Sequence, residues 1–103
     1  MSYVVRFVQT YLPGQRADFM ELEARFASLE QRRSDFPKGR RSQPYVGREP
    51  SNTLVWECEF PTLAAAQAAL EKIKGDEEHE ALFREQSRYT TKVYTEIDEI
   101  LEL

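Results

Sequence analysis

The chain has 103 residues, of which 41% are hydrophobic and 31% are charged, and its formal net charge is −4. This composition is that of a folded globular protein and excludes a disordered tail, a collagen-like chain and a disulfide scaffold. A chain of this length has room for one domain, so we expect a single domain over residues 1–103.

The opening residues, MSYVVRFVQTYL, have no basic region and no uninterrupted apolar run, and no later segment is apolar enough to cross a bilayer. We therefore expect a cytoplasmic protein with no membrane contact. The acidic net charge argues against nucleic acid as a partner, because phosphates are bound mainly by cationic surfaces.

The first half of the chain predicts one strong strand, one helix and one weak strand. Residues 3–11 alternate β-branched and aromatic side chains, which is typical of a strand. The next segment, 15–33, predicts an amphipathic helix because apolar residues recur every three or four positions: Phe19, Leu22, Phe26 and Leu29. Residues 42–48 predict a weak edge strand that contains Pro44, followed by a turn.

The second half predicts a strand, an interrupted helix and a final strand. Residues 53–60 alternate clearly, with Cys58 on the apolar side. Thr62 is expected to cap the second helix, Gly75 to interrupt it, and Asp76 to cap a further short helix. Thr90 to Ile97 form the last predicted strand.

This order is that of an α+β, ferredoxin-like β-α-β-β-α-β fold with a four-stranded antiparallel sheet and helices on one face. Alternation places two sets of side chains on opposite faces of the sheet. The helix-covered face is expected to hold Tyr3, Val5, Phe7, Leu54, Trp56 and Phe60. The open face is expected to hold Val4, Arg6, Val8, Val55, Glu57 and Glu59, so that its three valines would be exposed in a single copy.

The element order, the interruption at Gly75 followed by DEEHEALF, and the partly apolar open face resemble the dimeric α+β barrel superfamily. This superfamily includes antibiotic-biosynthesis-monooxygenase-like and NIPSNAP-like domains. The resemblance spans nearly the whole chain and implies a homodimer whose sheets face each other around cavities. Such cavities hold small hydrophobic or aromatic molecules, or haem in some members. The resemblance alone therefore makes haem a possible cofactor; no residue pattern in the sequence indicates one. No pattern here matches a particular catalytic subgroup.

The open face carries one set of candidate site residues. Arg6 lies on the central strand between Glu57 and Tyr94 of its neighbours. In a site, Arg6 could bind a carboxylate or enolate, Glu57 could act as base and Tyr94 could orient the ligand. The alternative, which we favour, is that these groups form cross-strand salt bridges in a dimer interface.

His79 is the only histidine. It could act as a general base, but a surface or helix-end position is favoured, because a lone histidine specifies little. The HExxH motif is absent, so no metal site is predicted. Cys58 is expected to be an inert core residue, because apolar burial raises a thiol's pKa.

The basic residues between the first helix and the weak strand are expected to be a hydrated loop rather than a phosphate or RNA site. They are Arg32, Arg33, Lys38, Arg40 and Arg41.

The sequence therefore leaves two candidate functions. One is a homodimeric domain that binds a small hydrophobic or aromatic ligand, with monooxygenase-like or isomerase-like chemistry. The other is a non-catalytic dimerisation or protein-interaction module.

Overall fold

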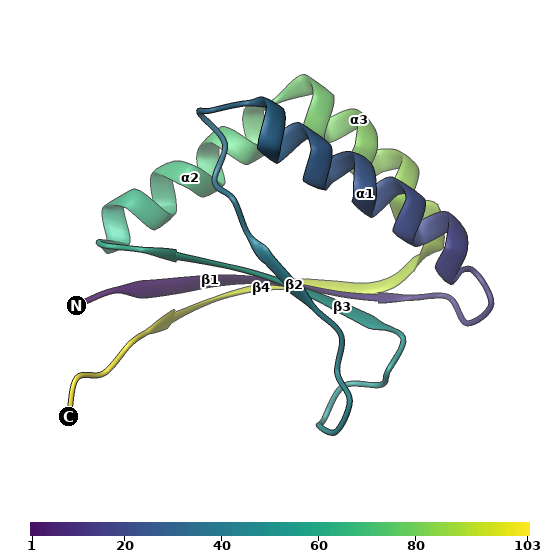
Figure 1. Ribbon diagram of the computed structural model, residues 1–103, viewed down its shortest axis with the longest axis horizontal. Helices are drawn as coiled ribbons and strands as arrows, with labels where there is room; N and C mark the ends of the chain where they lie inside the picture. The colour runs from purple at the N-terminus through teal and green to yellow at the C-terminus, as the bar shows by residue number, and fades with distance from the viewer.

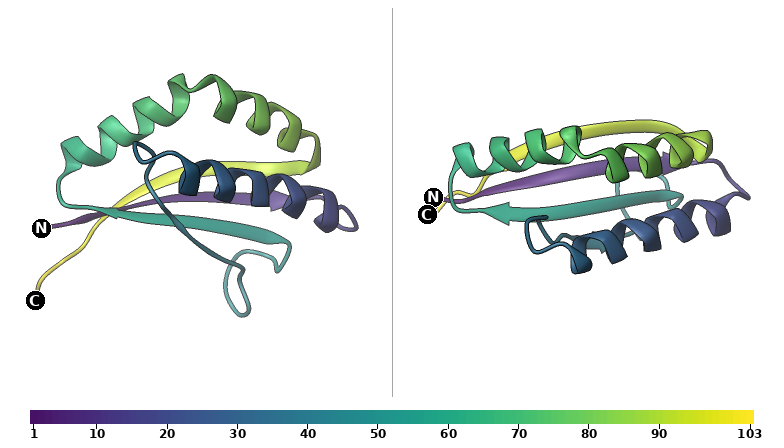
Figure 2. Two further views of the ribbon diagram at one scale, coloured as in Figure 1. Left: turned by 45° about the horizontal axis from the view of Figure 1, so that its top comes forward. Right: turned by 90° about the horizontal axis from the view of Figure 1, so that it is seen from above.

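The computed structural model describes residues 1–103 and has the predicted α+β, ferredoxin-like arrangement (Figure 1). In chain order its elements are β1 (Tyr3–Tyr11), α1 (Arg16–Arg32), β2 (Arg40–Ser42), β3 (Thr53–Phe60), α2 (Leu63–Gly75), α3 (Glu77–Gln86), a 3₁₀ turn (Ser87–Tyr89) and β4 (Thr90–Glu99). The four strands form one antiparallel sheet in the order β2-β3-β1-β4. All helices cover the same face, and α1 runs alongside α3 across it (Figure 2).

The core lies between the sheet and the helices, as the alternation predicts. Val5 and Trp56 form its centre together with Ala66 of α2. A second cluster joins Tyr11 of β1 and Leu54 of β3 to Phe19 of α1. None of the helices has the length and apolarity needed to span a bilayer.

The caps of the interrupted helix are confirmed. The Thr62 hydroxyl accepts a hydrogen bond from the backbone N–H of Ala65 at 3.0 Å, and Asp76 accepts one from the N–H of His79 at 3.0 Å. These bonds satisfy N–H groups that a helix start leaves free. Because Asp76 both ends α2 and begins α3, the two helices meet at an angle above the sheet.

The weak strand differs from its prediction. β2 covers only Arg40–Ser42, whereas the sequence placed it at 42–48. Pro44 has no N–H for a sheet ladder, and it lies in the loop that follows. Arg41 instead aligns opposite Trp56 of β3 and is drawn toward α1 by the carboxylates described below.

The loop between β2 and β3 lies against the open face of the sheet, on the side away from the helices (Figure 1). Glu49 in this loop accepts hydrogen bonds from Lys92 at 3.0 Å and from the Tyr94 hydroxyl at 2.8 Å. Val8 and Val55, which were expected to be exposed, are only 1% and 6% exposed in a single copy. The loop and the neighbouring side chains therefore already cover part of this face.

Candidate functional site

A cavity of about 590 Å³ with aromatic walls lies between the helices and the sheet. Its lining includes six Phe, Trp and Tyr residues, together with His79: Phe7, Phe26, Phe36, Trp56, Phe83 and Tyr94. The rings of Phe7 and Trp56 stack with their centroids 4.9 Å apart and their planes 15° from parallel. Aromatic faces of this kind bind flat, apolar ligands.

The cavity opens beneath α2 and α3. Its exposed lining residues all come from these helices and from the edge strand β4: Glu71, Lys74, Glu80, Val93 and Thr95. The lining residues contributed by α1 are buried. A ligand would therefore enter between the angled helices and β4 and meet α1 at the inner end.

The inner end holds two carboxylates of α1 and one cation of β2. The Arg41 guanidinium lies 2.6 Å from Glu23 and 2.5 Å from Glu30. Their side chains are only 8%, 11% and 21% exposed for Glu23, Glu30 and Arg41. Burial disfavours the charge of Arg41, but the hydrogen bonds and charges of the two carboxylates outweigh it and raise the pKa of Arg41.

Glu30 also binds two other groups. It accepts hydrogen bonds from the Trp56 indole N–H at 3.3 Å and from the backbone N–H of Gly39 at 3.2 Å. A Cβ atom at residue 39 would collide with the Trp56 ring, so the chain needs glycine here. Glu30 thus fixes the position of the indole that walls the cavity.

Sequence reasoning missed Glu23 and Glu30, although a signal was present. The two acids alternate with Phe19 and Phe26 at spacings of four, three and four, which places all four side chains on one face of α1. An acidic residue within an apolar stripe predicts a buried cation partner. The partner itself could not be found from spacing alone.

Two glutamines extend the buried polar network toward the sheet. The side-chain NH₂ of Gln86 donates to Glu23 at 2.9 Å and to the backbone carbonyl of Phe19 at 3.4 Å. The NH₂ of Gln9 donates to the Gln86 carbonyl oxygen at 3.0 Å. Gln86 is fully buried, Gln9 is 8% exposed, and both line the cavity.

His79 lies in the first turn of α3, as expected for a helix-end histidine, but its ring lines the cavity. The imidazole centroid is 4.8 Å from that of Phe26. Neither ring nitrogen is hydrogen-bonded to another residue. Burial lowers the pKa of His79, and the opposing charges of Asp76 and Glu30 only partly offset that effect. The imidazole is therefore neutral at neutral pH.

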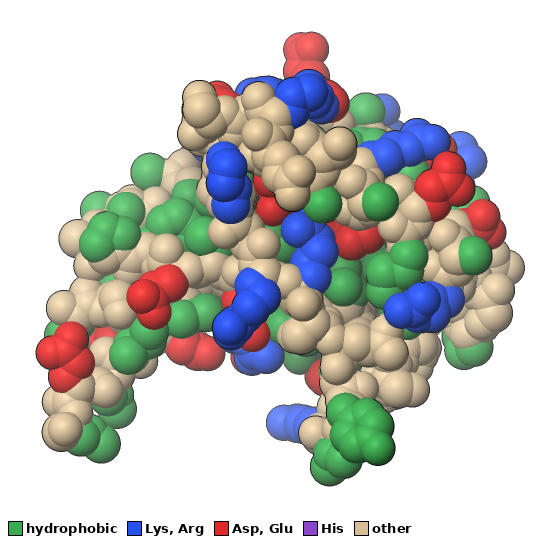
Figure 3. Space-filling model, in the orientation of Figure 1, with side chains coloured by type: hydrophobic (Ala, Val, Ile, Leu, Met, Phe, Trp, Pro, Cys, Tyr) green, Lys and Arg blue, Asp and Glu red, His purple; other side chains and the backbone are tan.

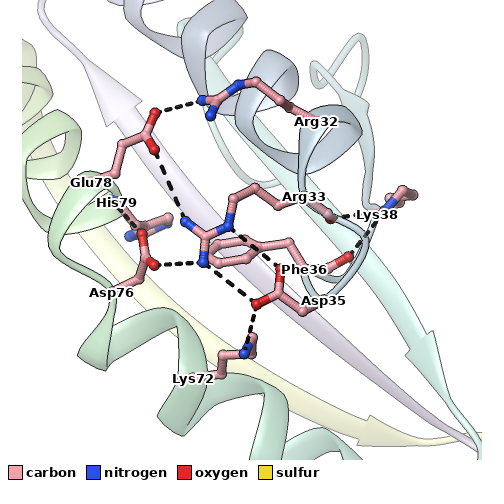
Figure 4. Close-up of polar contacts among 9 residues, drawn as sticks. All are labelled: Arg32, Arg33, Asp35, Phe36, Lys38, Lys72, Asp76, Glu78 and His79. Atoms are coloured by element: carbon pink, nitrogen blue, oxygen red, sulfur yellow. Dashed lines mark hydrogen bonds and ion pairs between the residues drawn. The ribbon is translucent and has the colours of Figure 1, made fainter.

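An ion-pair cluster joins the segment after α1 to the junction of α2 and α3, next to His79 (Figure 4). Arg33 lies 2.8 Å from Asp76 and 3.4 Å from Asp35, and Asp35 lies 2.9 Å from Lys72. Hydrogen bonds from Lys72 and Arg33 lower the pKa of Asp35 to about 2. Arg33 also covers the ring of Phe36, which lines the cavity.

The expectation of a hydrated basic loop therefore fits Arg32, Lys38 and Arg40, which are exposed, and is wrong for Arg33 and Arg41, which are partly buried. Arg33 and Arg41 hold internal carboxylates, Arg32 pairs with Glu78 at 2.5 Å, and Lys38 donates to backbone carbonyls. Lys38 and Arg40 are exposed and form no ion pair. Figure 3 accordingly shows basic and acidic side chains interspersed rather than a single basic patch.

The open-face candidates are brought together only in part. Arg6 aligns with Glu57 on one side and Glu96 on the other, and it pairs with Glu96 at 3.1 Å. Arg6 and Tyr94 line a second hollow of about 660 Å³ beneath the β2–β3 loop, but Glu57 does not. The Tyr94 hydroxyl is bound to Glu49, which raises the pKa of Tyr94. His79 lies on the opposite side of the sheet.

Cys58 packs against the core cluster around Val5 and Trp56, and burial raises the pKa of its thiol, which fits an inert residue. No group of three or more His, Cys, Asp or Glu side chains is arranged as metal ligands.

The chain matches no protein-family model and no curated protein. Solved structures do resemble it. A NIPSNAP family protein from Agrobacterium tumefaciens has a TM-score of 0.76 at 12% identity, over 99% of this chain and 95% of the other. An antibiotic biosynthesis monooxygenase-like protein from Deinococcus radiodurans has a TM-score of 0.69 at 11% identity, over 98% and 94%. A mutant of SnoaB, a cofactor-independent oxygenase from Streptomyces nogalater, has a TM-score of 0.66 at 16% identity, over 99% and 95%. At these identities the likeness establishes the fold, which is the one that the sequence predicts.

Proposed function

We propose that this chain binds a small, flat aromatic molecule in the cavity between the helices and the sheet, and that His79 accepts a proton from it. The observation that carries the proposal is that the stacked rings of Phe7 and Trp56 and the neutral imidazole of His79 face one ligand-sized cavity. The proposal moves the ligand from the open face, where the sequence placed it, to the helix-covered face.

The chemistry that this arrangement supports is proton abstraction. A neutral imidazole can take a proton from a ligand hydroxyl or from an acidic C–H group and leave the ligand as an anion. Such anions react with dioxygen or shift a double bond, so the proposal covers monooxygenase-like and isomerase-like chemistry. The likeness of the fold to that of SnoaB, a cofactor-independent oxygenase, supports the first of these.

Ligand binding is tested with the uncharged dye N-phenyl-1-naphthylamine. Trp56 is the only tryptophan and lines the cavity, so dye bound there will quench its fluorescence by energy transfer. We expect saturable binding at one dye per chain. Thr95→Tyr, which narrows the mouth, should weaken it, whereas Ala81→Tyr, on an exposed position outside the cavity, should not. Dye that binds both variants equally would contradict this location.

Proton abstraction is tested by measuring dioxygen consumption with 1-naphthol as substrate. Activity that depends on His79 should rise with pH through its lowered pKa, because only the neutral imidazole accepts a proton. His79→Phe keeps an aromatic ring in the cavity and should retain dye binding while losing this activity. Equal rates for His79→Phe and the wild type would remove His79 from the proposal.

We also propose that the chain forms a homodimer through the open face of its sheet. The helices leave this face uncovered, and the β2–β3 loop carries Tyr45 and Val46, which are 98% and 89% exposed. Figure 3 shows hydrophobic side chains gathered at the protruding tip of this loop. Exposed apolar groups beside a sheet face that no helix covers and the loop covers only in part support an interface, and a second copy fits the resemblance to dimeric barrels.

Sedimentation velocity tests the dimer. We expect a dimer at micromolar concentration, and Val46→Asp should shift it toward monomer. Leu63→Asp provides the control, because Leu63 is also exposed but lies on α2, in the other layer. A wild-type monomer would contradict the proposal. A dimer that binds no dye would favour the non-catalytic interaction module instead.

A further inference from the structure

We infer that Gln9 selects the ligand, and that the ligand carries a hydroxyl or similar hydrogen-bond donor, which the Gln9 carbonyl oxygen accepts. The inference rests on the proposed binding of an aromatic molecule in the cavity. It narrows the class of that molecule from aromatic hydrocarbons in general to hydroxylated ones.

The orientation of Gln9 follows from a chain of hydrogen bonds that begins at a fixed charge. Arg41 can only donate, so Glu23 is held as an acceptor. The Glu23 oxygen and the Phe19 carbonyl both face the end of the Gln86 side chain. Because neither of them can donate, Gln86 must present its NH₂ group to them.

The carbonyl oxygen of Gln86 therefore points the other way, toward Gln9. Gln9 must meet this oxygen with its own NH₂ group, because two carbonyl oxygens would repel each other. The buried ion pair at one end thus fixes which atom Gln9 presents at the other end. That atom is its carbonyl oxygen.

This oxygen faces the cavity. No other residue donates a hydrogen bond to it. In this protein, every side-chain nitrogen or oxygen that is fully shielded from solvent has a hydrogen-bond partner. The Gln9 oxygen must therefore touch open space, although the residue is only 8% exposed. Of the two hollows described above, only the one between the helices and the sheet is lined by Gln9.

An acceptor in this position discriminates between ligands. In the empty cavity water can bind to it, and a ligand with a donor replaces that water without loss. A ligand that lacks a donor displaces the water and leaves the acceptor unpaired, which weakens binding. The aromatic walls bind both kinds of ligand, so the difference between them reports on the acceptor.

The test compares 2-naphthol with 2-methoxynaphthalene by isothermal titration calorimetry. The two probes share the ring system, but only the first has a donor. We expect the wild type to bind 2-naphthol about twofold to tenfold more tightly, the range for one neutral hydrogen bond. Gln9→Met should bind both probes alike, and Gln67→Met, an exposed glutamine of α2, should behave as the wild type.

A measurement on the wild type makes the test independent of how well Gln9→Met folds. The ¹³Cδ resonance of Gln9 should shift when 2-naphthol is added and much less with 2-methoxynaphthalene.

Equal affinity of the wild type for the two probes would overturn the role of Gln9 and leave the cavity as a binding site. A preference for 2-naphthol that survives in Gln9→Met would also overturn it, since another acceptor would then be responsible. If neither probe binds, the proposed function fails together with the inference.

Discussion

Replacing Arg41 with methionine would leave Glu23 and Glu30 facing each other inside the protein without their shared cation. Both carboxylates are about nine-tenths buried, so water from the cavity can replace the guanidinium only in part. Removing one partner of such a buried ion pair typically costs about 3–5 kcal/mol. Because a domain of this size is stabilised by only about 5–15 kcal/mol in total, we expect Arg41→Met to be near the limit of folding.

The effect is measured by urea denaturation followed through the fluorescence of Trp56, with linear extrapolation to zero urea. A loss of about 3 kcal/mol also lowers the melting temperature by roughly 12 °C or more in a domain of about 100 residues. Arg40→Met is the matched control. Arg40 neighbours Arg41 on β2 but is exposed and makes no ion pair, so its replacement should change stability by less than about 0.5 kcal/mol.

A triple variant separates charge from packing. In Glu23→Gln/Glu30→Gln/Arg41→Met the carboxylates become neutral amides, which can still accept hydrogen bonds from Gln86, Trp56 and Gly39. We expect it to recover at least half of the stability lost in Arg41→Met, because no unpaired charge stays buried. The reasoning is refuted if Arg41→Met is no less stable than Arg40→Met, or if the triple variant is less stable than Arg41→Met.

Three further predictions concern single positions. The His79 imidazole should titrate by NMR with a midpoint below the ordinary value of 6.5. The free energy of unfolding should fall as pH drops from about 6.5 to that midpoint, because over this range the unfolded chain binds the proton more readily, and the fall should level off below the midpoint. A midpoint at or above 6.5, or the same pH dependence in His79→Gln, would count against burial of the ring. Gly39→Ala should destabilise by about 1–3 kcal/mol in urea melts, because its Cβ meets the Trp56 ring, whereas Gly47→Ala, with open space around it, should not. Thr62→Ala should cost about 1 kcal/mol through loss of the α2 cap, and Thr62→Ser should restore it.

Much of the fold could be predicted because period and capping are local signals. The alternation in 53–60 gave β3 with its full bounds, and the Thr62 and Asp76 caps located the starts of α2 and α3. The short strand β2 could not be found in this way. Its position depends on Arg41, whose partners lie 11 and 18 residues earlier in the sequence.

The candidate site was harder to predict for a related reason. Arg6, Glu57 and Tyr94 do share the open face, as alternation requires, but their partners in the structure are other residues, such as Glu96 and Glu49. The helix-side cavity combines residues from every strand and helix. Which side chains of α1 and α3 meet above the sheet depends on how the helices pack, and no local pattern records that.

The central position of β1 has a consequence for how the chain acquires its structure. β1 is the first strand to be synthesised, yet one of its neighbours in the sheet is β4, at residues 90–99. Its hydrogen bonds on that side stay open until residues 90–99 have been made. Pairings between such distant segments fold slowly, and an unpaired strand edge can associate with another chain. During synthesis β1 is therefore the segment most in need of protection from aggregation.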